Sequence, residues 1–186
     1  MNDTRIGGWI QTYTGKRFYP LDARHDEVDI RDIAHALSMQ CRYAGHCVRF
    51  YSVAEHCVLL SRHLQAEHGR LVARWALLHD ASEAYILDIP RPLKPELANY
   101  REVEDRLMEV IANRFHLYIE MPSVLKDADY RILADEIAQN LVPLQWDNTP
   151  GPPLGIDLKF WTPEQAEEEF LAQFDAVRVE RSLGTW

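Results

Sequence analysis

From Asp29 onward, apolar residues recur every three or four positions, which is the period of an α-helix and not the two-residue period of a strand. A chain with this pattern can bury its apolar residues only by packing helices against one another. The pattern therefore predicts an all-α fold, a helical bundle. The predicted helices cover the ranges 29–38, 52–64, 71–85, 101–117, 123–141 and 163–180.

The residues before this region have a different character. The sequence WIQTYTGKRFYP, residues 9–20, places β-favouring isoleucine, threonine, tyrosine and phenylalanine around Thr14 and Gly15. A glycine between two such runs is typical of a tight turn. We therefore expect a short N-terminal β-hairpin attached to the helical bundle.

Capping residues mark where two of the helices begin. Ser52 is a candidate N-cap with Glu55 three residues later, which is the spacing of a capping box. Residues 162–165, Thr-Pro-Glu-Gln, combine an N-cap threonine, a proline in the first turn and a glutamine that can complete the box. The sequence IPRPLKP at 89–95 breaks the helical pattern, because proline lacks the backbone donor and clashes with the preceding turn.

The chain length fits one domain with a substantial core. We interpret residues 1–186 as a single domain whose core spans about 25–142, since no internal repeat divides them. Residues 143–163 contain five prolines and two glycines and are expected to wrap the surface as an ordered loop. The C-terminal helix, 163–180, follows this loop.

The composition excludes several classes of protein. A net charge of −9 argues against a nucleic-acid polymer as partner, although a few converging cations could still bind a nucleotide phosphate. No apolar run approaches the ~20 residues that span a bilayer, and the N-terminus lacks the features of a signal peptide. We expect a cytosolic protein that does not bind membranes. Cys41, Cys47 and Cys57 form no CxxC pair, so we interpret them as buried reduced thiols.

Histidines and aspartates lie on the apolar faces of three predicted helices. His56 follows Val53 on one face, His79 shares a face with Trp75, and Asp129 lies one turn from Leu125. Carboxylates rarely face a core unless they are paired or bind a metal, because burying a bare charge costs several kcal/mol. Asp80, directly after His79, completes a set of candidate metal ligands that consists of two imidazoles and two carboxylates. Such a set suits zinc, cobalt, manganese or iron and leaves coordination positions for water.

The surroundings of the His79–Asp80 doublet distinguish it from a second doublet, His25–Asp26, which lies in a polar stretch and is expected in a surface loop. One turn after His79 comes Glu83, a carboxylate that could take a proton from an attacking water or position it.

The proline-rich turn that follows carries Asp88, Arg91 and Lys94. Cations at this position could hold phosphate oxygens. The competing interpretation of Arg91 and Lys94 is that they are exposed and have no function. The competing interpretation of Glu83 is that it forms a salt bridge on the helix surface.

Together these segments resemble the HD-domain phosphohydrolases, whose signature is a histidine, then a His–Asp doublet, then a distant aspartate. The resemblance is close to the 5′-deoxynucleotidase-like branch, which includes the bacteriophage dATP triphosphohydrolases. It covers roughly residues 9–142. The segments that carry it are DIAHALSMQCRYAGH (32–46), FYSVAEHCVLL (50–60), ALLHDASEAYILDIPRPLK (76–94) and VLKDADYRILADE (124–136).

The resemblance implies a role for each residue of the candidate site. The implied metal ligands are His56, His79, Asp80 and Asp129. Asp127 is a rival for the fourth position, but the relatives show the pattern Lys-x-Ala-Asp, which here ends at Asp129.

The same resemblance implies acid/base and water-orienting roles for two carboxylates, Glu83 and Asp88. It also implies substrate contacts. Arg42 would contact the phosphate or sugar, and Tyr43 stands where relatives place an aromatic residue, commonly tryptophan, against the sugar or base. Lys94 would contact phosphate. Lys126 is also assigned to the substrate-binding residues.

The activity implied by the resemblance is metal-dependent hydrolysis of deoxynucleotides in a bacterial or phage-infected cytosol. The favoured form is a dATP-type triphosphohydrolase that releases deoxynucleoside and triphosphate, with a second, weakly held divalent ion accompanying the triphosphate. The expected partners are the deoxynucleotide and further copies of the chain in a homo-oligomer.

Two alternatives to this activity stay open. One is a 5′-deoxynucleotidase, which would act on monophosphates. The other is a catalytically silent module, which would bind nucleotides without hydrolysing them. A cyclic-dinucleotide phosphodiesterase is disfavoured, because such relatives use additional histidines for a second metal.

Overall fold

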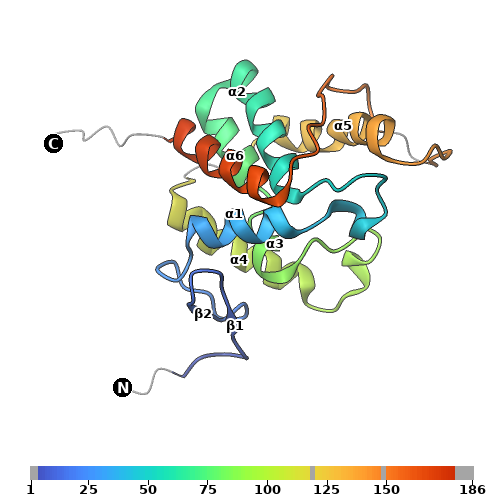
Figure 1. Cartoon of the computed structure of the whole chain (residues 1–186). Helices are drawn as coiled ribbons and strands as arrows, with labels where there is room; N and C mark the ends of the chain where they lie inside the picture. Colours follow the sequence, from blue (N-terminus) through green and yellow to red (C-terminus); the bar gives the residue numbers. More distant parts are fainter. Residues whose placement is uncertain (1–3, 118–119, 148–149, 179–186) are drawn as a thin grey trace, which may run out of the picture.

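The chain is mostly helical, with one short hairpin at its N-terminal end (Figure 1). The computed structural model describes residues 4–117, 120–147 and 150–178. The predicted all-α fold class with an N-terminal β-hairpin is confirmed. Within the described ranges, no helix has both the length and the apolar character needed to cross a membrane.

The hairpin consists of β1 (Ile10–Gln11) and β2 (Arg17–Phe18), paired antiparallel with Ile10 opposite Phe18. Phe18 is completely buried and stacks on Tyr85, with 3.9 Å between ring centroids. Near the turn, the backbone N–H and the hydroxyl of Thr14 donate to the carboxylate of Asp32, at 2.6 and 3.0 Å. These contacts attach a hairpin too short to be stable alone to the helical body.

The first helices follow the predicted starts. Helix α1 (Ile30–Met39) begins after Asp29, whose carboxylate caps it, and α2 (Val53–Leu78) begins after Ser52, whose hydroxyl accepts from the N–H of Glu55 at 3.0 Å. A short 3-10 helix, η1 (Arg42–Gly45), lies between them.

Helix α2 differs from its prediction in two ways. It joins the ranges predicted as two helices, with a kink at Gly69, whose φ of 79° is unfavourable for residues other than glycine. It also ends at Leu78, whereas the sequence predicted a helix continuing through 71–85. The chain tightens into a turn there, because the N–H groups of Ala81 and Glu83 each bond three residues back, and the short α3 (Glu83–Ile86) follows.

The remaining helices are α4 (Tyr100–Phe115), α5 (Ser123–Asn140) and α6 (Pro163–Ala176), with a 3-10 turn, η2 (Lys94–Glu96), ahead of α4. The predicted capping box of α6 is present. Its predicted end at residue 180 is wrong, because the backbone leaves the helical conformation at Val177; residues 179 and 180 lie outside the described ranges.

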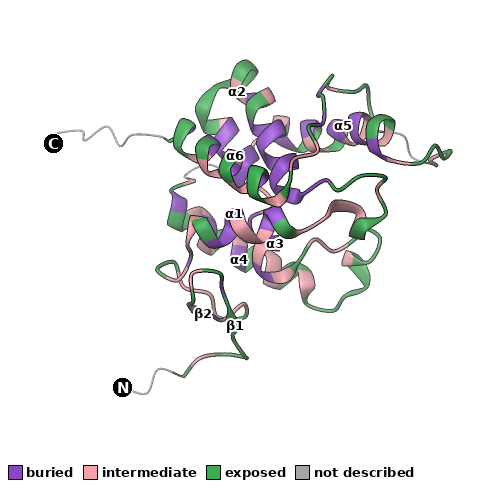
Figure 2. Cartoon of the chain, viewed as in Figure 1, coloured by how far each residue is buried: buried purple, intermediate pink, exposed green. Residues whose placement is uncertain are grey.

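Buried residues lie mainly on the helices (Figure 2) and form two adjoining groups. One lies where α6 packs against α1 and α2, and includes Leu77, Ile111 and Phe170. The other lies between α2 and α5 and includes Leu60 and Ile132. Because α2 contributes to both groups, residues near its two ends are held at fixed positions relative to α5.

The proline-rich segment runs back along α5 and is held by buried side chains. Asp135 accepts from the N–H groups of Leu154 and Gly155, at 2.8 and 3.0 Å. The carboxylate of Glu55, on the first turn of α2, accepts from three successive N–H groups at 159–161, at 2.7 to 2.8 Å. The expected capping box of α2 is thus half formed, since the Glu55 side chain binds a distant segment.

Glu55→Gln should destabilise the fold, because an amide offers one acceptor oxygen where the carboxylate offers two. Its NH₂ group would face one of the N–H donors, so we expect a loss of about 2–3 kcal/mol in the free energy of unfolding. Urea denaturation followed by circular dichroism measures this. The control is Glu109→Gln, which changes an exposed carboxylate on α4 and should shift stability by less than about 0.5 kcal/mol. Equal stability of the two variants would contradict the assignment.

Candidate metal centre

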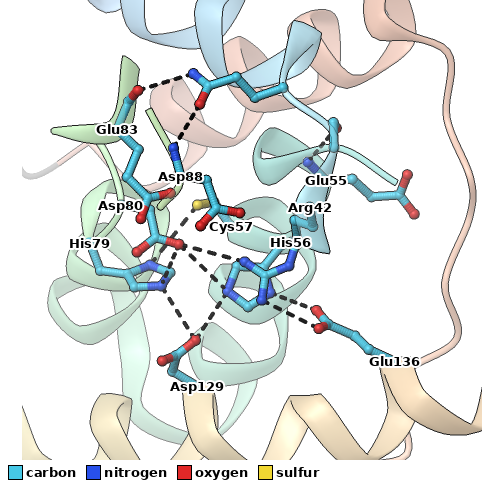
Figure 3. A network of polar contacts seen from close by, with 12 residues as sticks. Arg42, Glu55, His56, Cys57, His79, Asp80, Glu83, Asp88, Asp129 and Glu136 are labelled. Atoms are coloured by element: carbon cyan, nitrogen blue, oxygen red, sulfur yellow. Dashed lines mark hydrogen bonds and ion pairs between the residues drawn. The ribbon is translucent and has the colours of Figure 1, made fainter. Parts of the chain in front are cut away.

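The structure brings together the four residues that the sequence singled out (Figure 3). His56 comes from the first turn of α2, His79 and Asp80 from its end, and Asp129 from α5. The Nε2 atom of His56 lies 3.2 Å from Asp129 Oδ1, and that of His79 lies 3.2 Å from Asp80 Oδ2. The two imidazole centroids are 5.4 Å apart, with Asp80 on one side of the pair and Asp129 on the other.

The hydrogen bonds of the other ring nitrogens determine what the Nε2 atoms can do. His79 Nδ1 donates to the carbonyl oxygen of Ala76 at 2.7 Å, and His56 Nδ1 donates to the carboxylate of Glu136 at 2.8 Å. Both Nε2 atoms are buried and, among the described residues, make only charge contacts with the carboxylates and no hydrogen bond of good geometry. Histidines that bind metals are oriented in this way, with Nδ1–H bound to a carboxylate or a carbonyl and Nε2 left for the ion.

The electrostatics of the centre require positive charge between these groups. Burial acts to lower the pKa of both imidazoles, but the neighbouring carboxylates outweigh it, and the pKa of His79 is raised well above its usual value. Burial acts to raise the pKa of Asp80, yet the adjacent His79 lowers it to about 2. A divalent cation meets the same requirement, and two imidazoles with two carboxylates suit one. These buried side chains are therefore positioned to hold a metal ion.

Cys57 offers an alternative grouping with His79 and Asp80. Its Sγ lies 4.0 Å from His79 Nδ1, the nitrogen that already donates to Ala76. Burial raises the pKa of the thiol to about 11. The geometry thus favours the grouping of His56, His79 and Asp129.

Glu136 belongs to the site and was missed by the sequence analysis. It is completely buried on α5 and, besides His56, contacts the guanidinium of Arg42 at 3.3 Å and the hydroxyl of Tyr43. Burial alone would raise its pKa, but Arg42 and His56 lower it to about 2, so the group is a carboxylate. A signal was available, because Glu136 follows Asp129 by seven residues, two helical turns on the same face.

Arg42 and Tyr43 lie beside the centre on η1. The Arg42 guanidinium is also 3.8 Å from Asp80, so it neutralises carboxylates from two parts of the chain. Its Nε is buried and has no hydrogen-bond partner within the described ranges. The hydroxyl of Tyr43 bonds to Glu136, a contact that the expected role of Tyr43 against a sugar or base did not anticipate.

Glu83 lies at the start of α3 and is only 4% exposed. Burial is the main cause that raises its pKa to about 9, and Asp80 and Asp88 add to it. Lys94 binds one carboxylate oxygen at 3.2 Å, while the other oxygen is buried and has no hydrogen-bond partner among the described residues. The raised pKa favours the protonated form of Glu83 near neutral pH.

Gln40, at the end of α1, fixes this region from behind. Its amide NH₂ donates to the carbonyl oxygen of Glu83 at 3.0 Å, and its carbonyl oxygen accepts from the N–H of Asp88 at 3.1 Å. The two predicted acid/base carboxylates are thus held by a side chain that the sequence analysis did not consider.

The other predicted residues lie toward the surface. Arg91 is 72% exposed, with its guanidinium 3.9 Å from Asp129. Lys126 is exposed on α5 and, within the described ranges, makes no ion pair with the centre. Asp127 faces outward and pairs with Arg131 at 3.5 Å, which disfavours it as the fourth ligand. His25 is exposed, as expected for the surface doublet.

Comparison with known proteins places this helical protein in a family whose matched members are uncharacterized. Over 128 residues it is 44% identical to the uncharacterized Escherichia coli protein YfdR, an alignment that covers 69% of this chain and 70% of YfdR. Over 126 residues it is 34% identical to an uncharacterized protein of Rhodobacter capsulatus, covering 64% of each chain. The chain therefore belongs to the same protein family as YfdR. No family model matches the sequence.

Asp129→Ala should remove metal binding while the helical fold survives. Losing an outer partner of a ligand typically weakens binding about 10–100-fold, so losing a ligand should cost at least about 100-fold in affinity for zinc or cobalt. Metal content by mass spectrometry measures this, beside circular dichroism. Asp127→Ala, two residues away on the outer face, is the matched control. Metal loss from Asp127→Ala with retention by Asp129→Ala would reverse the assignment.

Proposed function

We propose that this protein is a metal-dependent phosphohydrolase of the HD type that acts on deoxynucleotides, with a deoxynucleoside triphosphate as the favoured substrate. The observation that carries the proposal is the pair of buried Nε2 atoms, on His56 and His79, that face Asp80 and Asp129 and have no hydrogen-bond partner in the part of the chain that the structure describes. The intact signature of the HD family at these positions supports the same proposal.

The four residues would hold one divalent cation, zinc, cobalt, manganese or iron, while Glu136 and the Ala76 carbonyl keep the imidazoles in the required tautomer. When bound, the cation supplies Lewis acidity, which polarises a phosphoryl group and makes water a competent nucleophile near neutral pH. The protein's own contribution is to orient the ligands and exclude competing donors.

Cations around the carboxylates support a phosphate-bearing substrate. Arg42 and Lys94 are part-buried, and Arg91 reaches the centre from the exposed side. Each can form charge-assisted hydrogen bonds with phosphate oxygens, which are roughly twice as strong as neutral ones. A polyanion would engage several of them at once, and this favours a triphosphate over a monophosphate.

Glu83 is suited to transfer a proton at the reacting phosphate. Lys94 holds one of its oxygens, so the unpartnered oxygen can donate its proton to the departing 5′ oxygen or exchange one with the attacking water. The products would be deoxynucleoside and intact triphosphate. A nucleotide-binding module without activity would have no use for this raised pKa, which favours the enzyme.

Glu83→Gln should separate chemistry from binding. The variant keeps every metal ligand, so its metal content should match the wild type, while kcat falls by about two to four powers of ten, the usual contribution of a positioned proton-transfer group. Steady-state kinetics and mass spectrometry on the same samples measure both. Glu109→Gln, an exposed change, serves as control. Turnover near the wild-type rate would make Glu83 a structural acid and transfer its role to Asp88.

The substrate is tested by comparing dATP with dAMP in wild type and Lys94→Ala. If a triphosphate is the substrate, the wild type releases intact triphosphate, and the variant loses about one to two powers of ten in kcat/KM on dATP but less on dAMP. Lys159→Ala, which removes an exposed lysine, should change neither value. Equal losses on both substrates, with inorganic phosphate as the only product, would favour the 5′-deoxynucleotidase.

A further inference from the structure

Two cysteines face each other across the loop that carries Arg42 and Tyr43. The sulfur atoms of Cys41 and Cys47 are 3.4 Å apart, and both residues are partly accessible to solvent as free thiols. The prediction that all three cysteines are buried is wrong for Cys41 and Cys47; of the three, only Cys57 is completely buried. Neither Cys41 nor Cys47 has a role in the proposed chemistry.

The backbone explains why these thiols meet. Tyr43, Ala44 and Gly45 all have positive φ, at 57°, 49° and 81°, so the chain doubles back within three residues. Hydrogen bonds fix both ends of the loop. At one end the N–H of Arg42 donates to the Tyr51 carbonyl at 2.9 Å, and at the other the N–H of Val48 donates to the carbonyl of Asn140, the last residue of α5, at 2.8 Å. The loop is therefore a closed turn whose two sulfurs are already in contact.

This turn also holds the side chains nearest to the metal centre. Arg42 contacts Asp80 and Glu136, and the Tyr43 hydroxyl contacts Glu136, which in turn orients His56. A bond between the sulfurs would require a separation of about 2.05 Å, so the two sulfur atoms must approach each other by more than an ångström. Any part of this approach that the backbone supplies moves Arg42 and Tyr43, since they lie between the two cysteines.

We propose that Cys41 and Cys47 form a reversible oxidation site, in which a hydroperoxide converts the two thiols to a disulfide that displaces Arg42. One thiolate attacks the peroxide oxygen, giving a sulfenic acid and releasing the alcohol or water derived from the peroxide. The second thiol then attacks this sulfur, forming the S–S bond and releasing water. Two electrons pass from the sulfurs to the peroxide, and dithiol reductants reverse the change.

The surroundings set the rate of this oxidation. Burial and the contact with Cys41 raise the pKa of Cys47 to about 11, so little thiolate is present at neutral pH. Oxidation should therefore be slow at pH 7 and accelerate as the pH rises, because the thiolate is the reactive form. Cys57 should remain unoxidised in the same protein, since it is completely buried.

Trypsin resolves the three cysteines without any mutation. Arg42 lies between Cys41 and Cys47, so the cysteines fall in separate peptides, 32–42, 43–49 and 50–62. After treatment of the whole protein with hydrogen peroxide and alkylation of remaining thiols, we expect 32–42 linked to 43–49, and 50–62 alkylated. Dithiothreitol should separate the linked pair. Cys41→Ser and Cys47→Ser should each abolish the link.

The effect on Arg42 rests on the proposed function and is measured separately. Oxidised wild type should show a KM for dATP raised by about five- to tenfold, within the one to two powers of ten that a full phosphate contact contributes, and reduction should restore it. Cys47→Ser treated identically should keep its KM within about twofold.

Absence of the linked peptides after exhaustive peroxide treatment at pH 9 would overturn the proposal. A link that forms while the KM of an active enzyme stays constant would overturn the displacement of Arg42. If the protein hydrolyses no nucleotide at all, the peptide analysis still decides the oxidation site. Failure of the proposed function is thereby distinguished from failure of this inference.

Discussion

Burial of the Glu136 carboxylate imposes the strongest condition on this fold, because an unpaired charge in the interior would be prohibitively costly. Glu136, on α5, is compensated by Arg42 and the Tyr43 hydroxyl from η1 and by His56 from α2. Helix α5, the start of α2 and the turn at 42–45 must therefore all be in place together. The same condition fixes the His56 ring, so the metal centre and the packing of the helices depend on one ionic network.

The helical architecture could be predicted because its determinants are local. Apolar period, capping residues and proline breaks located the helices, and the hairpin followed from β-favouring residues around Gly15. The predictions that were wrong concern places where contacts between distant parts of the chain determine the local structure. The helix predicted over 71–85 ends at Leu78. The Glu55 side chain, expected to cap its own helix, instead binds backbone N–H groups more than a hundred residues away.

The candidate site was accessible from the sequence only in part. His56, His79 and Asp129 were recognisable as polar residues on apolar helical faces, a local pattern that the structure brings to one point. Glu136 had the right spacing from Asp129, but nothing local marks a glutamate as an ionic partner of Arg42, 94 residues earlier. The roles of Gln40 and of the paired cysteines depend likewise on contacts that only the folded chain creates.

The hydrogen bonds between the Glu55 carboxylate and the backbone of residues 159–161 have a consequence for synthesis on the ribosome. Glu55 is adjacent to His56, and its buried carboxylate lacks these donors until Trp161 has emerged. The first turn of α2 therefore cannot bury this carboxylate with its partners while residues 159–161 are still inside the ribosome. The candidate metal centre, which includes the adjacent His56, should reach its final geometry only when the chain is nearly complete.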